Sequence, residues 1–176
     1  MLGHIVSKYG VKIDPNGVIA IQDLTLPRSK KEVQSFLGKI NFLKRFISNF
    51  VEVVKHITCM LKKDKEFKWT IESKNSFELI KKAIIEAPQL VSPKYSKPFL
   101  IFSFASQDTI VATLLKKYSE NMEAPIEFFS RALRDAKLKY EMLEKHAYAL
   151  VKALKVFRVY ILHAQVIPYV PSFVVR

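Results

Sequence analysis

Apolar residues recur at steps of three and four through residues 33–50, which is the spacing of one buried helix face. The members of this stripe are Val33, Phe36, Leu37, Ile40, Leu43, Ile47 and Phe50. Just before it, Ser29 and Glu32 have the spacing of a capping box, in which each side chain bonds the backbone amide of the other residue. Lysine and arginine lie mostly off the stripe. The pattern therefore predicts a capped amphipathic helix with a basic outer face.

Other helices are predicted on both sides of this stripe. An Asp-Pro pair at residues 14–15 supplies an N-cap followed by proline at the first helical position, which predicts a short helix over residues 15–23. A further helix is predicted over residues 51–63. Thr70 can cap another, which Pro88 ends. In that helix the expected inward residues are Phe77, Ile80 and Ile84, and the expected outward residues are Lys81 and Lys82.

The second half of the chain has the pattern of strands around one long helix. The apolar run at residues 99–104 is typical of a buried strand. Further strands are predicted as a hairpin over residues 2–7 and 11–13, and over residues 109–117, 124–130 and 166–170. Residues 139–162 predict a helix whose inner face consists of Leu143, Ala147, Leu150, Leu154, Phe157 and Ile161.

These elements predict a mixed α+β or α/β fold. A small hairpin and several helices are followed by three antiparallel strands, a long helix and a fourth strand. The pattern of apolar residues changes from helical to strand-like after Pro88, and Pro93 and Pro98 frame a linker. We therefore expect two domains, at residues 1–92 and 98–176.

Charge and cysteine content limit the classes of binding partner and of metal site that this chain can have. The 29 lysines and arginines exceed the 16 acidic residues, giving a formal net charge of +13, which favours polyanionic partners such as nucleic acid. Cys59 is the only cysteine, so an internal disulfide is excluded and a cysteine zinc site is disfavoured. The apolar runs are too short to cross a bilayer. We expect an intracellular protein, cytoplasmic or nuclear, with no membrane contact.

Several motifs occur in an order that resembles one known family. They are residues 2–7, 14–15, 29–46 and 67–70, Phe77, and residues 87–90. Together they resemble the polymerase polyproteins of gypsy-type LTR retrotransposons. The resemblance implies the end of a reverse transcriptase, with a primer-gripping hairpin and a helical thumb and connection, followed by a truncated RNase H-like domain. The family acts as an RNA-directed DNA polymerase and as a ribonuclease on RNA–DNA hybrids. An adjacent Asp-Asp pair, expected at a polymerase site, does not occur in this chain.

The resemblance gives the basic helix face a role. A polymerase thumb holds a duplex through its phosphates, which lysine and arginine neutralise without reading bases. The candidate nucleic-acid contacts are Lys30, Lys31, Lys39, Lys44 and Arg45. The competing interpretation is an ordinary solvated helix face.

Active RNase H domains of the family hold two Mg²⁺ ions with carboxylates. By the resemblance, the principal aspartate position is Phe104, within residues 103–106, and the third acid position is Pro171. Glu144 matches the remaining carboxylate. Asp108 lies near enough in sequence to be considered as a substitute ligand, although its side chain would have to reach back over Phe104. We therefore expect no metal or other cofactor for this chain.

Three hypotheses remain open at this point. The first is a non-catalytic fragment of a retrotransposon polyprotein that still binds nucleic acid. The second is a working RNase H with an atypical ligand set around Glu144 and Asp108. The third is a host-recruited or inert interaction module. Self-association is a further expectation, because the last strand would lie at a sheet edge beside the apolar residues 173–175, although Pro168 and Pro171 would hinder edge pairing.

Overall fold

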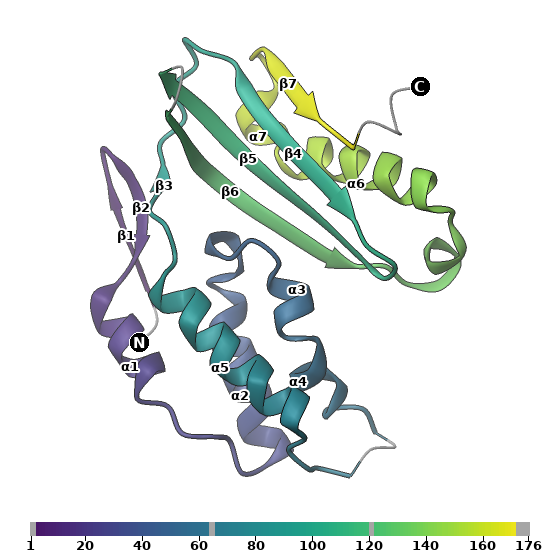
Figure 1. The fold of residues 1–176 in the computed structure, drawn as a ribbon. Coiled ribbons are helices and arrows are strands. Elements are labelled where there is room, and N and C mark those ends of the chain that lie inside the picture. The colour runs from purple at the N-terminus through teal and green to yellow at the C-terminus, as the bar shows by residue number, and fades with distance from the viewer. Residues whose placement is uncertain (1–2, 64–65, 120–121, 172–176) are drawn as a thin grey trace.

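A computed structural model describes residues 3–63, 66–119 and 122–171, and it contains two sheets with helices around them (Figure 1). The elements of the first half are β1 (His4–Ser7), β2 (Gly10–Ile13), α1 (Pro15–Gln22), α2 (Lys30–Asn41), the 3₁₀ turn η1 (Lys44–Phe46), α3 (Phe50–Val53), α4 (Lys55–Cys59), α5 (Ile71–Ile85) and β3 (Leu90–Val91). Those of the second half are β4 (Phe99–Ala105), β5 (Thr109–Ser119), β6 (Met122–Ala132), the 3₁₀ turn η2 (Asp135–Lys139), α6 (Met142–Val156), α7 (Arg158–Ile161) and β7 (Val166–Tyr169). The predicted fold class is confirmed.

The first sheet is a hairpin with a short third strand, in the order β1-β2-β3. The predicted hairpin is present, but the pairing of β3 with β2 was not predicted. Gly10 makes this pairing possible: its φ is +135°, and a Cβ atom there would lie 1.9 Å from the carbonyl oxygen of Leu90. Only glycine fits such a close approach at this backbone angle.

The helices of the first half surround one apolar core. Phe36 of α2 packs against Phe77 of α5, with ring centroids 5.0 Å apart, and Ile80 is fully buried. The predicted stripe of residues 33–50 is largely buried, but it does not form one helix. The helix α2 ends at Asn41, and the chain continues through η1 into α3. The predicted helix over residues 51–63 is likewise divided between α3 and α4.

The helix caps predicted from the sequence are present in part. Ser29 accepts the amide of Glu32 at 3.2 Å, as predicted. The Glu32 carboxylate, however, accepts the amide of Arg28 at 2.7 Å rather than that of Ser29. Thr70 caps α5 as predicted. Lys81 is half-buried because its ammonium donates to the carbonyl of Leu24 at 3.0 Å, so the prediction that it faces solvent is wrong.

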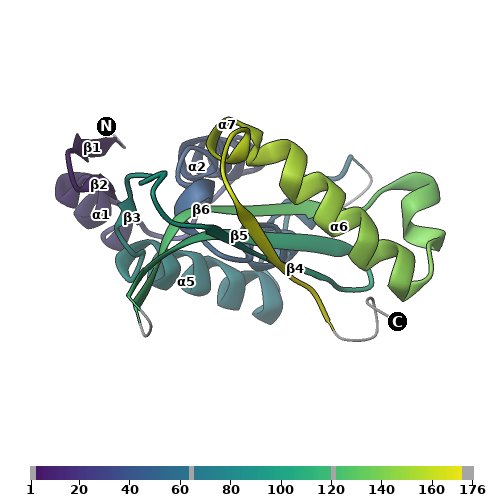
Figure 2. The same ribbon diagram turned by 90° about the horizontal axis from the view of Figure 1, so that it is seen from above.

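The second sheet has the order β6-β5-β4-β7, with β7 parallel to β4 at one edge (Figure 1). The helix α6 lies across one face of this sheet (Figure 2). The first half of the chain meets β6, where the amide of Val51 donates to Ser130 at 3.1 Å and Phe128 packs into the first core. The second core lies between the sheet and α6, around Phe99, Ile101 and Phe157.

Two predictions about the second half need correction. The strand β4 is not buried on both faces, because Phe102 and Phe104 are exposed. The inner face of α6 is also turned from the predicted one. Its buried residues are Lys145, His146, Ala149 and Ala153. Of the predicted inner residues Phe157 is buried and Leu150 and Ile161 are half-buried, whereas Leu143, Ala147 and Leu154 are exposed.

Edge strand β7 contains Pro168, as predicted. The apolar residues 173–175 lie outside the described residues. Within the described ranges, none of the helices has the length and apolar character needed to cross a membrane. The division into domains at residues 92 and 98 stays a prediction.

Candidate functional site

Phe104 lies near the end of β4, at the position where the resemblance expects a metal-binding aspartate. Its side chain is 54% exposed, and its ring meets the ring of His146 on α6 edge to face, with centroids 5.0 Å apart. An aromatic ring offers no oxygen ligand to a divalent cation. At this position β4 therefore presents an apolar contact with α6.

His146 connects α6 to β4 beside this ring. It is buried, and its Nδ1 accepts the amide of Ala105 at 3.2 Å. This bond requires an unprotonated Nδ1. Burial lowers the pKa of His146 below its ordinary value, because the charged imidazolium is poorly solvated there. His146 thus acts as a neutral acceptor that holds the second turn of α6 to the strand.

Glu144 is exposed in the first turn of α6. Its carboxylate accepts the backbone amide of Glu141 at 2.8 Å, which satisfies one of the amides that a helix start leaves without a partner. A carboxylate near a helix N-terminus is also favoured by the helix dipole. The structure thus gives Glu144 a capping contact, whatever further role it has.

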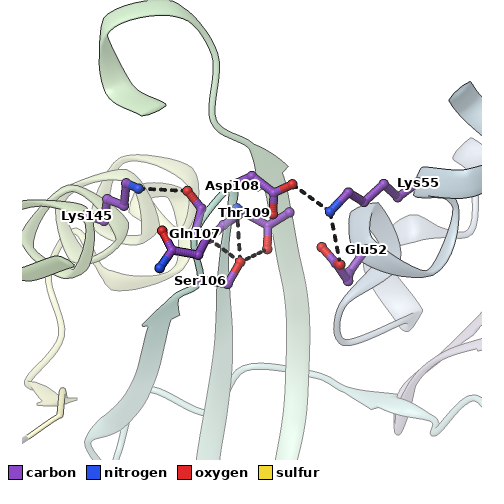
Figure 3. Close-up of polar contacts among 7 residues, drawn as sticks. All are labelled: Glu52, Lys55, Ser106, Gln107, Asp108, Thr109 and Lys145. Carbon is purple, nitrogen blue, oxygen red and sulfur yellow. Dashed lines mark hydrogen bonds and ion pairs between the residues drawn. The ribbon is translucent and has the colours of Figure 1, made fainter. Parts of the chain in front are cut away.

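Asp108 lies in the turn between β4 and β5, facing the first half of the chain (Figure 3). Its Oδ2 is 2.6 Å from the ammonium of Lys55, which also lies 3.5 Å from Glu52. The hydrogen bond from Lys55 to Asp108 is the main cause that raises the pKa of Lys55. Asp108 is therefore engaged by a cation, and a metal ion at Asp108 would have to compete with this ammonium.

The same turn is held from its other side by Lys145 (Figure 3). This buried lysine of α6 donates to the carbonyl of Gln107 at 2.7 Å. Inside the turn, the hydroxyls of Ser106 and Thr109 are 2.7 Å apart, and the amide of Thr109 donates to Ser106 at 3.1 Å. The turn is thus fixed between α4 and α6 by two lysines, and no local sequence signal indicated either contact.

The residues at the three acid positions that the resemblance implies do not fit a pair of divalent cations. Phe104 and Pro171 lack side-chain oxygens, so Glu144 is the one carboxylate at the three positions. Within residues 3–63, 66–119 and 122–171, no three His, Cys, Asp or Glu side chains gather in a way that could hold a metal ion.

The five basic residues predicted to contact nucleic acid fall into two groups. Lys31, Lys39 and Lys44 are exposed. The other two make contacts within the protein. Lys30 donates to the carbonyl of Lys62 at 3.0 Å, and Arg45 donates to the hydroxyl of Tyr160 at 3.2 Å. The first group is available to phosphates, whereas the second also joins separate segments of the fold.

Lys39 borders an open depression of about 400 Å³ beside α2. The segment from Leu24 to Arg28 forms one wall, and Glu32, Ser35, Phe36 and Lys39 of α2 form the other. The depression carries both Arg28 and Glu32, so its charge is mixed. It is not an isolated cationic site.

One aromatic feature was missed by sequence reasoning. Phe102 of β4 and Tyr169 of β7 stack with centroids 4.5 Å apart and an interplanar angle of 3°. The parallel register places the two residues side by side, and both are partly exposed. An exposed face of β4 could not be recognised from the sequence, because residues 100, 102 and 104, which share the side of Phe102, are all apolar.

Comparisons with known proteins agree with this architecture. Residues 69–167 match the family described as the RNase H-like domain found in reverse transcriptase. The chain is 38% identical over 165 residues to the retrovirus-related Pol polyprotein from transposon 297 of Drosophila melanogaster, covering 93% of this chain and 15% of that protein. It is 28% identical over 160 residues to the transposon Tf2-3 polyprotein of Schizosaccharomyces pombe, covering 91% and 12%. The chain thus spans a small part of these relatives.

Solved structures of foamy viral protease-reverse transcriptase are also similar. One, in complex with double-stranded DNA, has a TM-score of 0.78 and 28% sequence identity, covering 96% of this chain and 30% of that one. Another, in complex with an RNA/DNA hybrid, has the same TM-score and identity and covers 96% and 23%. The family match covers more than half of the 176 residues. This chain belongs to the family of RNase H-like domains found in reverse transcriptases.

Proposed function

We propose that this chain is a nucleic-acid-binding, non-cleaving part of a retrotransposon reverse transcriptase–RNase H polyprotein. The observation that carries the proposal is the contact of Phe104 with His146, because Phe104 stands where the resemblance expects the principal metal ligand. RNase H chemistry needs carboxylates that hold two metal ions close together. In this chain Glu144 would lack the two carboxylates expected beside it. The chain would therefore bind nucleic acid without cleaving it.

Charge supports the binding part of the proposal. The formal net charge is +13, and Lys31, Lys39 and Lys44 are exposed along α2 and η1. Lysines at such positions neutralise phosphates and release counterions, which gives affinity without sequence preference. The similar foamy viral proteins are described in complex with double-stranded DNA and with an RNA/DNA hybrid. We assign the same two classes of duplex to this chain.

Salt-dependent binding tests this assignment. The affinity for a DNA duplex and for an RNA–DNA hybrid is measured over a range of salt concentrations. For B-DNA, each phosphate contact contributes about 0.9 to the slope of log K against log salt, so Lys31→Ala with Lys39→Ala should flatten that slope by about 1.8. Lys68→Ala with Lys74→Ala removes the same charge from exposed positions outside α2 and serves as control. Equal flattening in both double variants would contradict a localised contact.

The cleavage part is tested separately. The purified chain is incubated with a labelled hybrid and either Mg²⁺ or Mn²⁺, and the hybrid should remain intact. Cleavage that disappears in Glu144→Gln would overturn the non-cleaving assignment and favour the atypical RNase H. Asp108 is paired with Lys55 in the structure, which weighs against that alternative.

The remaining expectations belong to the same proposal. Residues 1–92 would form the thumb and connection part, and residues 98–176 the RNase H-like part. Failure to bind either duplex would leave the host-recruited or inert interaction module as the better hypothesis. Self-association and an intracellular location are likewise proposed.

A further inference from the structure

The helix α6 has a second apolar surface besides the one that covers the sheet. His146, Ala149 and Ala153 face the protein, whereas Leu143 and Leu154 are 49% and 39% exposed. We call the set Leu143, Ala147, Leu150, Val151 and Leu154 the outer α6 ridge; four of them are exposed, and Leu150 is half-buried against the second core. The helix α6 forms the outer layer on its face of the sheet (Figure 2). Because four of its five members are exposed, the ridge faces solvent.

The spacing of the ridge suits a second helix. Leu143, Ala147, Leu150 and Leu154 follow one another at alternating steps of four and three residues. This repeat keeps one seam of a helix against a neighbouring helix along its length. Ala147 is small and lies beside Leu150 near the centre, where it permits close approach. The ridge therefore has the pattern of a helix–helix interface.

The pattern is also symmetric about its centre. Ala147 and Leu150 lie at equal distances from the midpoint between residues 148 and 149, and Leu143 and Leu154 are centred on the same midpoint. In a two-fold symmetric pair, each surface must be complementary to itself. An antiparallel pair of α6 helices would place Leu143 of each copy opposite Leu154 of the other, and Ala147 opposite Leu150. Large residues then meet at both ends of the interface.

Charge selects this antiparallel orientation. Glu144 lies in the first turn of α6 and Lys155 in its last turn, and both are exposed. Antiparallel packing brings the acidic end of each helix to the basic end of the other. Parallel packing would bring like charges together at both ends, which is unfavourable. We propose that the outer α6 ridge is the interface of a homodimer in which α6 packs antiparallel against the same helix of a second copy.

The size of the ridge limits the expected affinity. A helix of 15 residues is about 22 Å long. One seam of this length buries less than the ~800 Å² per partner that is usual for a stable interface. The dimer should therefore form in the micromolar range and dissociate on dilution.

Sedimentation velocity across the micromolar range tests the interface. The dimer fraction of the unmodified chain should rise with concentration. Leu154→Lys should raise the dissociation constant at least tenfold, because it places a cation in the apolar seam. Leu79→Lys is the matched control, since Leu79 is 54% exposed on α5, and it should leave the dimer unchanged. A chain that stays monomeric, or a dimer insensitive to Leu154→Lys, would overturn the proposal.

A cross-linking experiment tests the orientation. Cys59 is first replaced by serine so that no other thiol is present. Leu143→Cys with Leu154→Cys should then give a disulfide-linked dimer under mild oxidation, whereas either cysteine alone should give little. Efficient linkage by Leu143→Cys alone would indicate parallel helices and overturn the antiparallel arrangement.

Discussion

His146 makes one part of the stability depend on pH. Burial lowers its pKa below 6.5, so protonation favours the unfolded chain, in which the imidazole is solvated. The contribution of neutral His146 is complete above pH 6.5 and declines as the pH falls below 6.5 toward the lower folded-state pKa.

The variant His146→Asn should reduce this pH dependence. Its carbonyl oxygen can still accept the amide of Ala105 but does not titrate between neutral and mildly acidic pH. Urea unfolding of both proteins, at neutral pH and at about pH 5, gives the free energy lost on acidification, which should be smaller in the variant. His163→Asn is the control, because His163 is exposed. An equal loss in all three proteins would contradict a role for His146.

The sequence indicated some residues of the candidate site but not others. Phe104 was singled out because residues 103–106 resemble a motif of the family, and the structure adds its contact with His146. Lys55 and Lys145 were not found, because each meets the turn at residues 106–109 from a distant part of the chain. A lysine on a helix carries no local signal that separates a solvated side chain from one that bonds a remote carbonyl.

Elements were predictable where local signals decided them. The caps at Ser29 and Thr70 mark the starts of α2 and α5 as expected. The orientation of α6 was not predictable, because apolar residues cover much more than half of its circumference. Of the two overlapping faces, the predicted one contains most of the outer α6 ridge, and the sheet covers the other. Tertiary packing therefore decided between two nearly equivalent periodic patterns.

Gly10 offers a test of the pairing between β2 and β3. Gly10→Ala should destabilise the fold by about 1–3 kcal/mol, since the new Cβ atom would meet the carbonyl of Leu90 at a positive φ. Gly38→Ala is the matched control, because the helical Gly38 has open space around it. This control should stabilise the protein by about 0.5–1 kcal/mol. Chemical denaturation measures both changes, and equal effects would show that the close approach at Gly10 is unimportant.

The two halves of the molecule are connected at several points. Phe128 of β6 packs into the first core, and Val51 donates to Ser130. The pair Lys55–Asp108 adds a partly exposed ion pair, which by itself is worth about 0.2–1 kcal/mol. The apolar packing is therefore the main link, and the polar contacts fix its geometry. Such a link would let the two halves unfold together.

Cooperative unfolding can be tested with one conservative change in each core. Ile101 and Ile80 are both fully buried, in the second and first core respectively. Ile101→Val and Ile80→Val should each cost about 0.5–1.5 kcal/mol. Trp69, the only tryptophan, packs in the first core, so its fluorescence reports that half, while hydrogen exchange of β4 and β5 reports the other. If the halves unfold as one unit, Ile101→Val will lower the unfolding midpoint seen by Trp69, and Ile80→Val will lower the protection of β4. A Trp69 midpoint unmoved by Ile101→Val would show that the two halves unfold independently.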